Sequence, residues 1–167
     1  FFAASDFIEA IISGKGGHAA KPHETVDPTV IASQIVVALQ TIASRRADPV
    51  EQVVVSITSF ETSSTAFNVI PQEVKIKGTV RTLDPHVRDL AEKEFLRITE
   101  LTAEAMGGSA DAKFTRGYPV MSNSSEQTEF AAKVARDVAG ECAEAPLVMG
   151  GEDFAYMLEE RPGAYIL

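Results

Sequence analysis

A histidine behind a glycine-rich turn is the side chain best suited to chemistry in this chain. His18 follows Gly14, Gly16 and Gly17, and it lies between an apolar run and a helix start at residues 27–28. Glycine lets a backbone adopt unusual conformations and approach another group closely. An imidazole at such a turn can offer a ring N–H to a group outside its own domain. Two interpretations of His18 remain open: an exposed histidine bonded within its own turn, and a site residue.

The other two histidines and the recognisable motifs do not form a self-sufficient catalytic site. His23 stands just before the helix start, where capping of the loop explains it, and His86 stands in the first turn of a second helix. No His-x-x-x-His or Cys/His pair with metal-ligand spacing is present, and neither is a Gly-x-Ser-x-Gly turn. Residues 14–17 also lack the Gly-Lys-Ser/Thr that a phosphate-binding loop requires.

Four further polar residues are candidates for a site, and each also has an ordinary structural explanation. Asn68 precedes Val-Ile-Pro, where asparagine is typical of a turn. Arg81 lies inside a predicted strand, where it either reaches solvent or pairs with an anion such as a carboxylate. Glu152 and Asp153 follow two glycines at a strand-to-helix turn. Acidic side chains favour helix starts, and such turns are also where α/β sheets gather their sites.

The composition predicts a globular protein and narrows the classes of partner. Hydrophobic residues make up 45% of the 167 residues, enough for a packed core. The net charge of −9, without a basic block, argues against a nucleic-acid partner. A single cysteine, Cys142, allows no internal disulfide. No apolar run is long enough to span a bilayer, so we expect no membrane partner and a cytoplasmic location.

The elements that must position these residues alternate in a recognisable order. Two Asp-Pro pairs predict helix starts, and β-branched alternation predicts strands. The order β-α-β-β-α-β predicts a ferredoxin-like domain at residues 5–117, in which an antiparallel four-stranded sheet carries two helices on one face. Its expected elements are residues 5–13 (strand), 27–46 (helix), 52–60 (strand), 73–83 (strand), 84–107 (helix) and 110–116 (strand).

Residues 118–167 have a different pattern and predict a partial α/β segment. After a linker at 118–123, we expect a helix at 124–140, a short strand at 146–149, a short helix at 152–158 and a last strand at 164–167. Alternating helices and strands imply a parallel sheet covered on both faces, and about fifty residues cannot supply such a core alone. We therefore expect this chain to be a segment of a longer protein.

Five short motifs that occur in order resemble one known family. They are residues 14–23 (GKGGHAAKPH), 26–28 (VDP), 68–71 (NVIP), 78–82 (GTVRT) and 150–154 (GGEDF). Together they resemble the M20 metallopeptidases over almost the whole chain. The similarity is greatest to the branch of N-acyl-amino-acid, hippurate and indoleacetyl-amino-acid hydrolases. The SST sequence before Asn68 departs from this pattern, since many relatives carry glycines there.

The resemblance implies an enzyme whose site is shared between two subunits. Members have a catalytic α/β domain with two divalent metal ions, usually zinc or manganese, and an inserted ferredoxin-like lid that mediates dimerisation. The metal ligands would lie outside this chain, so no metal ion is expected in it. His18 would stabilise the oxyanion in the partner subunit's site, Asn68 would contact substrate, and Arg81 would bind the substrate carboxylate. Glu152 and Asp153 match an acidic pair near the metal site, without an assigned role.

Two functions follow as expectations. The first is the lid and dimerisation segment of a metal-dependent amidohydrolase, which as a homodimer hydrolyses N-acyl amino acids or small peptide-like amides; the segment alone is expected to be inactive. The second is a non-catalytic dimeric ferredoxin-like module that binds amino acids or mediates assembly, because a fold alone does not decide function. Both predict a dimer formed through an edge strand and the first helix.

Overall fold

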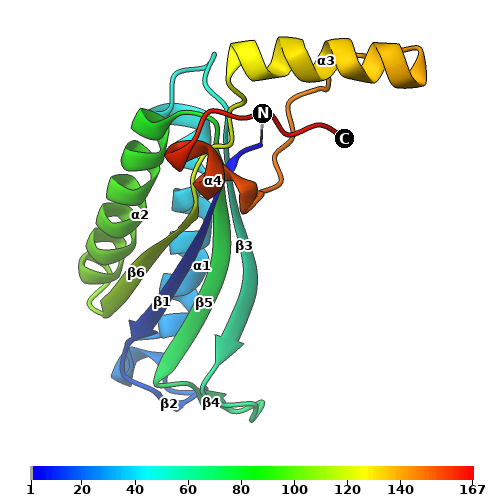
Figure 1. Cartoon of the computed structure of the whole chain (residues 1–167). Helices are drawn as coiled ribbons and strands as arrows, with labels where there is room; N and C mark the ends of the chain where they lie inside the picture. The colour runs from blue at the N-terminus through cyan, green and yellow to red at the C-terminus, as the bar shows by residue number, and fades with distance from the viewer. Residues whose placement is uncertain (1) are drawn as a thin grey trace.

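The central element of the structure is a four-stranded antiparallel sheet covered on one face by two helices (Figure 1). The computed structural model describes residues 2–167. The strands lie in the order β3-β5-β1-β6. The prediction of the ferredoxin-like fold is confirmed, and its elements in chain order are β1 (Ala4–Ser13), α1 (Pro28–Leu39), β3 (Val53–Thr62), β5 (Glu73–Thr82), α2 (Pro85–Ala105) and β6 (Ser109–Tyr118).

Alternation along the strands produces the hydrophobic core. In β1 the even-numbered residues from position 6 onward are buried beneath the helices, whereas Phe7 and Ile11 stand on the open face of the sheet. Helix α1 packs Ile31, Ile35 and Leu39 into the same core. The buried hydrophobic residues of the strands and α2 that meet there are Ile8, Ala10, Ile12, Val55, Val74, Ile76, Val80, Ala91, Phe95, Ile98 and Ala103.

Both helices begin where the Asp-Pro pairs predict. Each aspartate carboxylate accepts a hydrogen bond from a backbone N–H of the first turn, at 2.8 Å for Asp27 and 2.7 Å for Asp84. These bonds satisfy N–H groups that have no partner within the helix. The first helix is shorter than predicted, because α1 ends at Leu39 and Ile42–Arg46 form a separate π-helical turn, η2.

A small second sheet that the sequence did not predict closes one end of the molecule. Strand β2 (Gly17–His18) pairs antiparallel with β4 (Val69–Ile70), and both lie at the lower end in Figure 1. A 3-10 turn, η1 (Pro22–Glu24), follows β2. We call residues 14–21 and 66–71 the tip.

The segment after β6 lies at the opposite end and has little core of its own. It contains α3 (Ser125–Ala139) and α4 (Phe154–Glu160). The strands predicted at 146–149 and 164–167 are not formed, and only Val148 makes an isolated bridge, to Phe2. A strand needs a neighbour to complete its hydrogen bonds, and the described residues supply none there beyond that bridge.

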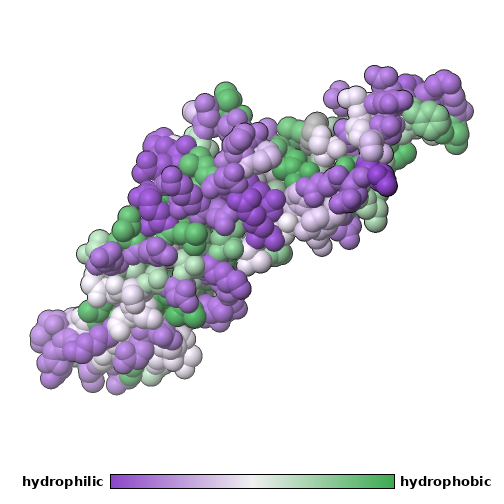
Figure 2. Space-filling view, turned by 60° about the vertical axis from the view of Figure 1, so that its left-hand side comes forward, coloured by the Kyte–Doolittle hydropathy of each residue, from purple (hydrophilic) through white to green (hydrophobic). Residues whose placement is uncertain are grey.

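The surface of this segment is partly apolar. Helix α3 has no buried residue and exposes Phe130, Val134 and Val138. Figure 2 shows an elongated molecule on which hydrophobic side chains reach the surface in separate patches along its length. Among residues 2–167, no helix combines the length and hydrophobicity needed to cross a membrane.

Candidate functional site

Backbone hydrogen bonds hold the two chain segments of the tip together. The β2–β4 pairing places His18 opposite Val69. Next to this pair, the Ala19 N–H donates to the Asn68 carbonyl oxygen at 3.0 Å. Two of the predicted site residues, His18 and Asn68, are therefore neighbours in space although they are far apart in the sequence.

Three glycines permit this close packing of backbone. A Cβ atom on Gly14 would lie 2.2 Å from the Val26 carbonyl oxygen, and one on Gly16 would lie 2.5 Å from that of Ile70. A Cβ on Gly17 would lie 2.8 Å from a threonine methyl group. None of the three glycines has a positive φ. They are required for close approach, and the expectation of unusual backbone conformations is wrong here.

The imidazole of His18 has one nitrogen bound within its own turn and one available. The Ala20 N–H donates to His18 Nδ1 at 3.1 Å. Since Nδ1 accepts this bond, the proton of the neutral ring is on Nε2. No described residue hydrogen-bonds to Nε2, and His18 is exposed. The turn bond orients the ring and leaves Nε2 without a partner among the described residues, and the interpretation of His18 as a site residue stays a prediction.

The side chains beside His18 on the tip are also exposed. Asn68 is exposed, and its amide makes no hydrogen bond among the described residues. The neighbouring Phe67 is fully exposed and Val69 is 43% exposed. The tip therefore presents an imidazole N–H, an amide and apolar side chains to whatever surface it meets. His23 and His86 are exposed and lie outside this group.

Arg81 lies at the other end of the sheet. The register pairs Glu73 of β5 with Ser13, next to the tip, and Arg81 with Ser5. Arg81 lies eight residue steps along the strand from Glu73, a distance of about 27 Å at the usual rise per residue. The structure does not bring Arg81 together with His18 and Asn68 within one chain.

Two backbone carbonyls hold the Arg81 guanidinium. Its Nη1 donates to the Val80 oxygen at 3.0 Å and to the Asp6 oxygen at 3.4 Å. Among the described residues, its Nε and Nη2 have no hydrogen-bond partner, and the side chain is only partly buried. Arg81 can therefore still bind a carboxylate with these two donors.

Glu152 and Asp153 lie on the same end of the molecule as Arg81. A Cβ on the preceding Gly151 would lie 2.5 Å from the Ser5 side chain, so this turn is packed against the start of β1. Glu152 accepts long hydrogen bonds from the Phe154 N–H at 3.4 Å and the Tyr165 hydroxyl at 3.5 Å. Asp153 is exposed and makes no side-chain bond to the start of α4.

The potential metal ligands do not converge. Within residues 2–167, no three or more His, Cys, Asp or Glu side chains are grouped so that they could hold a metal ion. Glu152 and Asp153 bring two carboxylates to one place and no third ligand joins them. The described residues therefore do not by themselves fit the dinuclear centre that the resemblance implies.

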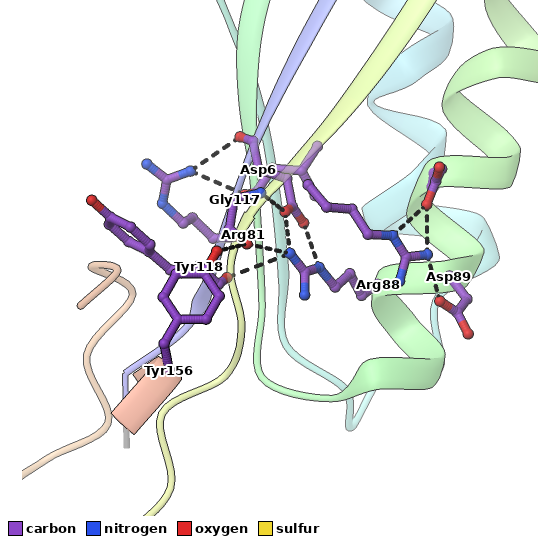
Figure 3. Close-up of polar contacts among 10 residues, drawn as sticks. Asp6, Arg81, Arg88, Asp89, Gly117, Tyr118 and Tyr156 are labelled. Atoms are coloured by element: carbon purple, nitrogen blue, oxygen red, sulfur yellow. Dashed lines mark hydrogen bonds and ion pairs between the residues drawn. The ribbon is translucent and has the colours of Figure 1, made fainter. Parts of the chain in front are cut away.

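A buried ion pair close to Arg81 was missed by sequence reasoning. Asp6 is fully buried, and its carboxylate accepts two hydrogen bonds from Arg88, at 2.6 and 3.0 Å (Figure 3). Two signals could have revealed the pair. Asp6 lies on the inward-facing side of β1, as do Ile8 and Ile12. Arg88 is a cation in the first turn of a helix, where the helix dipole disfavours it.

We call Asp6, Arg81, Arg88, Gly117 and Tyr118 the root.

An exposed ion cluster borders the root on α2. Arg116 donates to Asp89 at 2.6 Å and to Glu92 at 2.7 Å. These hydrogen bonds raise the pKa of Arg116 above its ordinary value, with the Asp89 bond contributing most. Because the cluster is exposed, we expect it to contribute little to stability.

Comparison with known proteins connects this architecture to one family. Residues 5–105 match the family model of the peptidase dimerisation domain M20_dimer. The chain is 37% identical to thermostable carboxypeptidase 2 of Saccharolobus solfataricus, over 98% of this chain and 41% of that protein. It is 39% identical to the N-acetyl-L-cysteine deacetylase of Bacillus subtilis, over 98% of this chain and 39% of that enzyme. The chain thus spans about two fifths of the length of these relatives.

Solved structures agree with this match. A dinuclear metal-binding peptidase of the M20 family from Bacillus subtilis superimposes with a TM-score of 0.76 at 30% identity, over 98% of this chain and 40% of that one. A tripeptidase from Staphylococcus aureus gives a TM-score of 0.79 at 26% identity, over 95% and 41% of the two chains. The fold, the family match and these similarities lead to one conclusion: this chain belongs to the M20 family of peptidases and amidohydrolases and contains its dimerisation domain.

Proposed function

We propose that the intact protein hydrolyses the amide bond of N-acyl amino acids or small peptide-like substrates, and that this segment supplies its lid. The observation that carries the proposal is the free Nε2–H of His18 on an exposed tip. An N–H aimed at the carbonyl oxygen of an amide stabilises the negative charge that develops there during hydrolysis. The names of relatives, among them an N-acyl-L-amino acid amidohydrolase of Geobacillus stearothermophilus, favour this substrate class.

The separation of the tip from Arg81 supports a site shared by two subunits. A substrate of two or three residues spans at most about 7–11 Å when extended. His18 and Arg81 of one chain are too far apart to contact one such molecule. We propose that Arg81 binds the substrate carboxylate in its own subunit, and that His18 and Asn68 enter the same site from the partner subunit.

The side of the sheet formed by β3 and α1 is the surface that we propose for the homodimer. Strand β3 is an edge of the sheet and can pair with a second copy. On α1, Val30 and Val37 are 49% and 66% exposed. Two strands and two helices would then pack across a two-fold axis.

The remaining parts of the enzyme are assigned by the same proposal. Residues 5–117 form the lid and dimerisation domain, and residues 118–167 are part of the catalytic domain, with Glu152 and Asp153 near its metal site. The intact enzyme contains two divalent metal ions, zinc or manganese, held by residues outside this chain. The segment alone is then inactive, and hippurate hydrolysis by residues 1–167 with added zinc or manganese would contradict that assignment.

Mixing two variants of the intact enzyme that each lower activity toward the carboxylate substrate tests the shared site. In a mixed dimer of His18→Ala and Arg81→Met, the His18→Ala subunit keeps its own Arg81 and receives His18 from its partner. One of its two sites is therefore complete. Random mixing makes half of the dimers mixed, so activity should recover to roughly a quarter of the wild-type value.

The controls are each variant mixed with itself, with mixed dimers counted by native mass spectrometry. No recovery in the presence of mixed dimers would show that His18 and Arg81 do not act in one site across the dimer. Absence of amide hydrolysis by the metal-loaded wild type would instead favour the non-catalytic module.

A further inference from the structure

The carboxylate of Asp6 is the most enclosed charged group of the root. It is fully buried and accepts three hydrogen bonds, two from Arg88 and one from the Gly117 N–H at 3.0 Å. A buried carboxylate is costly unless it is paired and hydrogen-bonded. With three donors, Asp6 is held in one position.

A bulge in β6 makes the third bond possible. Ser5 pairs with Tyr118 but Phe7 pairs with Thr115, so β6 contains one residue more than β1 at this point. The extra residue turns the Gly117 N–H toward the Asp6 carboxylate. A Cβ on Gly117 would lie 2.2 Å from the Ser5 oxygen, so no larger residue fits there.

The same cluster extends to residues 118–167, the segment that we propose belongs to the catalytic domain. The Arg88 guanidinium also donates to the carbonyl oxygens of Gly117 at 3.1 Å and Tyr118 at 3.4 Å. The Tyr156 hydroxyl of α4 donates to the same Gly117 oxygen at 3.3 Å. The rings of Tyr118 and Tyr156 also meet edge to face, with centroids 6.0 Å apart. Figure 3 shows these side chains around the end of β6.

Asp6 contacts Arg81 through its backbone. Its carbonyl oxygen accepts from Arg81 Nη1, while its carboxylate is bound on the other side by Arg88 (Figure 3). A shift of Asp6 would therefore move one of the two oxygens that orient the Arg81 guanidinium. The residue connects Arg81 to α2, to β6 and, through Gly117 and Tyr156, to the segment that carries Glu152.

We propose that Asp6, clamped by Arg88, is a positioning residue that sets the guanidinium of Arg81 for the substrate carboxylate. The proposal rests on the proposed function, in which Arg81 binds that carboxylate. It adds a cause for substrate selection: the preference for a free carboxylate depends on a buried ion pair that does not touch the substrate. Recognition by two donors requires accurate placement of the guanidinium plane.

The test compares two substrates in the intact, metal-loaded enzyme. One is an N-acyl amino acid, and the other is the same compound with a carboxamide in place of the carboxylate. In Asp6→Asn we expect KM for the carboxylate substrate to rise about tenfold, the size of one weakened charge-assisted hydrogen bond. The kcat with either substrate should stay near its wild-type value. The KM for the carboxamide should also stay near its wild-type value, because it does not depend on Arg81.

Arg88→Lys gives the second variant, since it keeps a positive charge beside Asp6 and loses the two-pronged contact. If Asp6→Asn does not fold, this variant decides, and the same selective rise in KM is expected. Asp89→Asn is the matched control, because it changes an exposed partner one residue further along α2 and should alter neither KM. Equal changes with both substrates, or no change, would overturn the positioning role.

Arg81→Met separates this proposal from the one on which it rests. Loss of carboxylate preference in Arg81→Met, together with unaltered preference in Asp6→Asn and Arg88→Lys, would reject only the role of Asp6. An unaltered preference in Arg81→Met itself would reject the assignment of Arg81, and with it both proposals.

Discussion

The tip and the root lie at the two ends of one sheet and are stabilised in different ways. At the tip, His18, Asn68 and Phe67 are exposed, and backbone hydrogen bonds between the glycine-rich segment 14–21 and the segment 66–71 hold them. At the root, Asp6 is fully buried, the Arg88 side chain is 11% exposed, and several side-chain hydrogen bonds bind them. Among the described residues the side-chain donors of His18 and Asn68 are unoccupied, whereas Arg88 and the Gly117 N–H at the root are bound to Asp6.

The difference fits the roles that we propose for the two ends. Side chains proposed to act on another molecule need free donors, and the tip is stabilised by its backbone and not by its side chains. Side chains that hold a position must have their donors satisfied, so the root is linked through side chains. Arg81 lies between these two cases, because Nη1 is bound and two other donors are not.

Removing a root charge should have the largest effect on stability. Arg88→Ala leaves the Asp6 carboxylate buried without its partner, and this should lower the free energy of unfolding by about 3–5 kcal/mol. Urea unfolding of this chain measures the loss. The control Asp89→Ala breaks an exposed pair with Arg116 and should cost less than about 1 kcal/mol. Similar losses for the two variants would remove the distinction between buried and exposed pairs.

Removing the tip imidazole should affect turnover and not stability. In the intact enzyme, His18→Ala should lower kcat about 10²–10³-fold, the usual cost of one donor to an oxyanion. Metal content and the unfolding midpoint should stay unchanged, because His18 is exposed and only its Nδ1 is bonded. His23→Ala is the control, as that side chain is 76% exposed on the next turn. Unchanged turnover in His18→Ala would leave it an ordinary turn histidine.

Adding one methyl group to the tip backbone tests how it is held. In Gly16→Ala the new Cβ would lie 2.5 Å from the Ile70 oxygen, and such overpacking costs about 1–3 kcal/mol. Differential scanning calorimetry should show a lower Tm, and turnover should fall because His18 moves. Gly150→Ala is the matched control, since its nearest atom is 3.5 Å away. Equal Tm values for the two variants would show that the tip does not need close backbone contact.

The smallest effect is expected from replacing Glu94, which lies on the same helix as Arg88. Its ion pair with Arg97 lies between the buried and the exposed pairs in exposure. Hydrogen bonds from Arg97 hold the pKa of Glu94 below its ordinary value of 4.5, and the charges of Arg97 and Arg46 lower it further. A lowered pKa stabilises the folded state above pH 4.5, and this contribution is lost as the pH falls through the folded pKa.

Glu94→Gln should therefore reduce stability at neutral pH, and should reduce it less at about pH 3. Urea midpoints at the two pH values measure this difference. A loss of the same size at both pH values would assign the effect to packing of Glu94 and not to its charge.

Much of the fold could be predicted because its signals are local. The Asp-Pro helix starts at Asp27 and Asp84, and the alternation in β1 and β5, each depend on residues a few positions apart. The strands expected at 146–149 and 164–167 failed for the converse reason. An apolar run becomes a strand only when a neighbouring strand pairs with it.

The site could be predicted only in part. His18, Asn68 and Arg81 were predicted one by one as candidates from their motifs, and their roles stay predictions. Their distribution over the two ends of the sheet was not predicted. Asp6 and Arg88 belong to no motif. The hydrogen bond that Asp6 accepts from Gly117 depends on a bulge in β6, and no local sequence pattern predicts that bulge.

The sequence by itself determined which segments become strands and helices, which strand faces turn inward, and which family the motifs resemble. Only the tertiary structure decided that His18 adjoins Asn68, that Arg81 lies a sheet length away, and that Asp6 is clamped by Arg88. The physical reason is the range of the interactions. Propensity, capping and alternation act between near neighbours in the chain, whereas a site and a buried ion pair form between residues that only the folded sheet brings into contact.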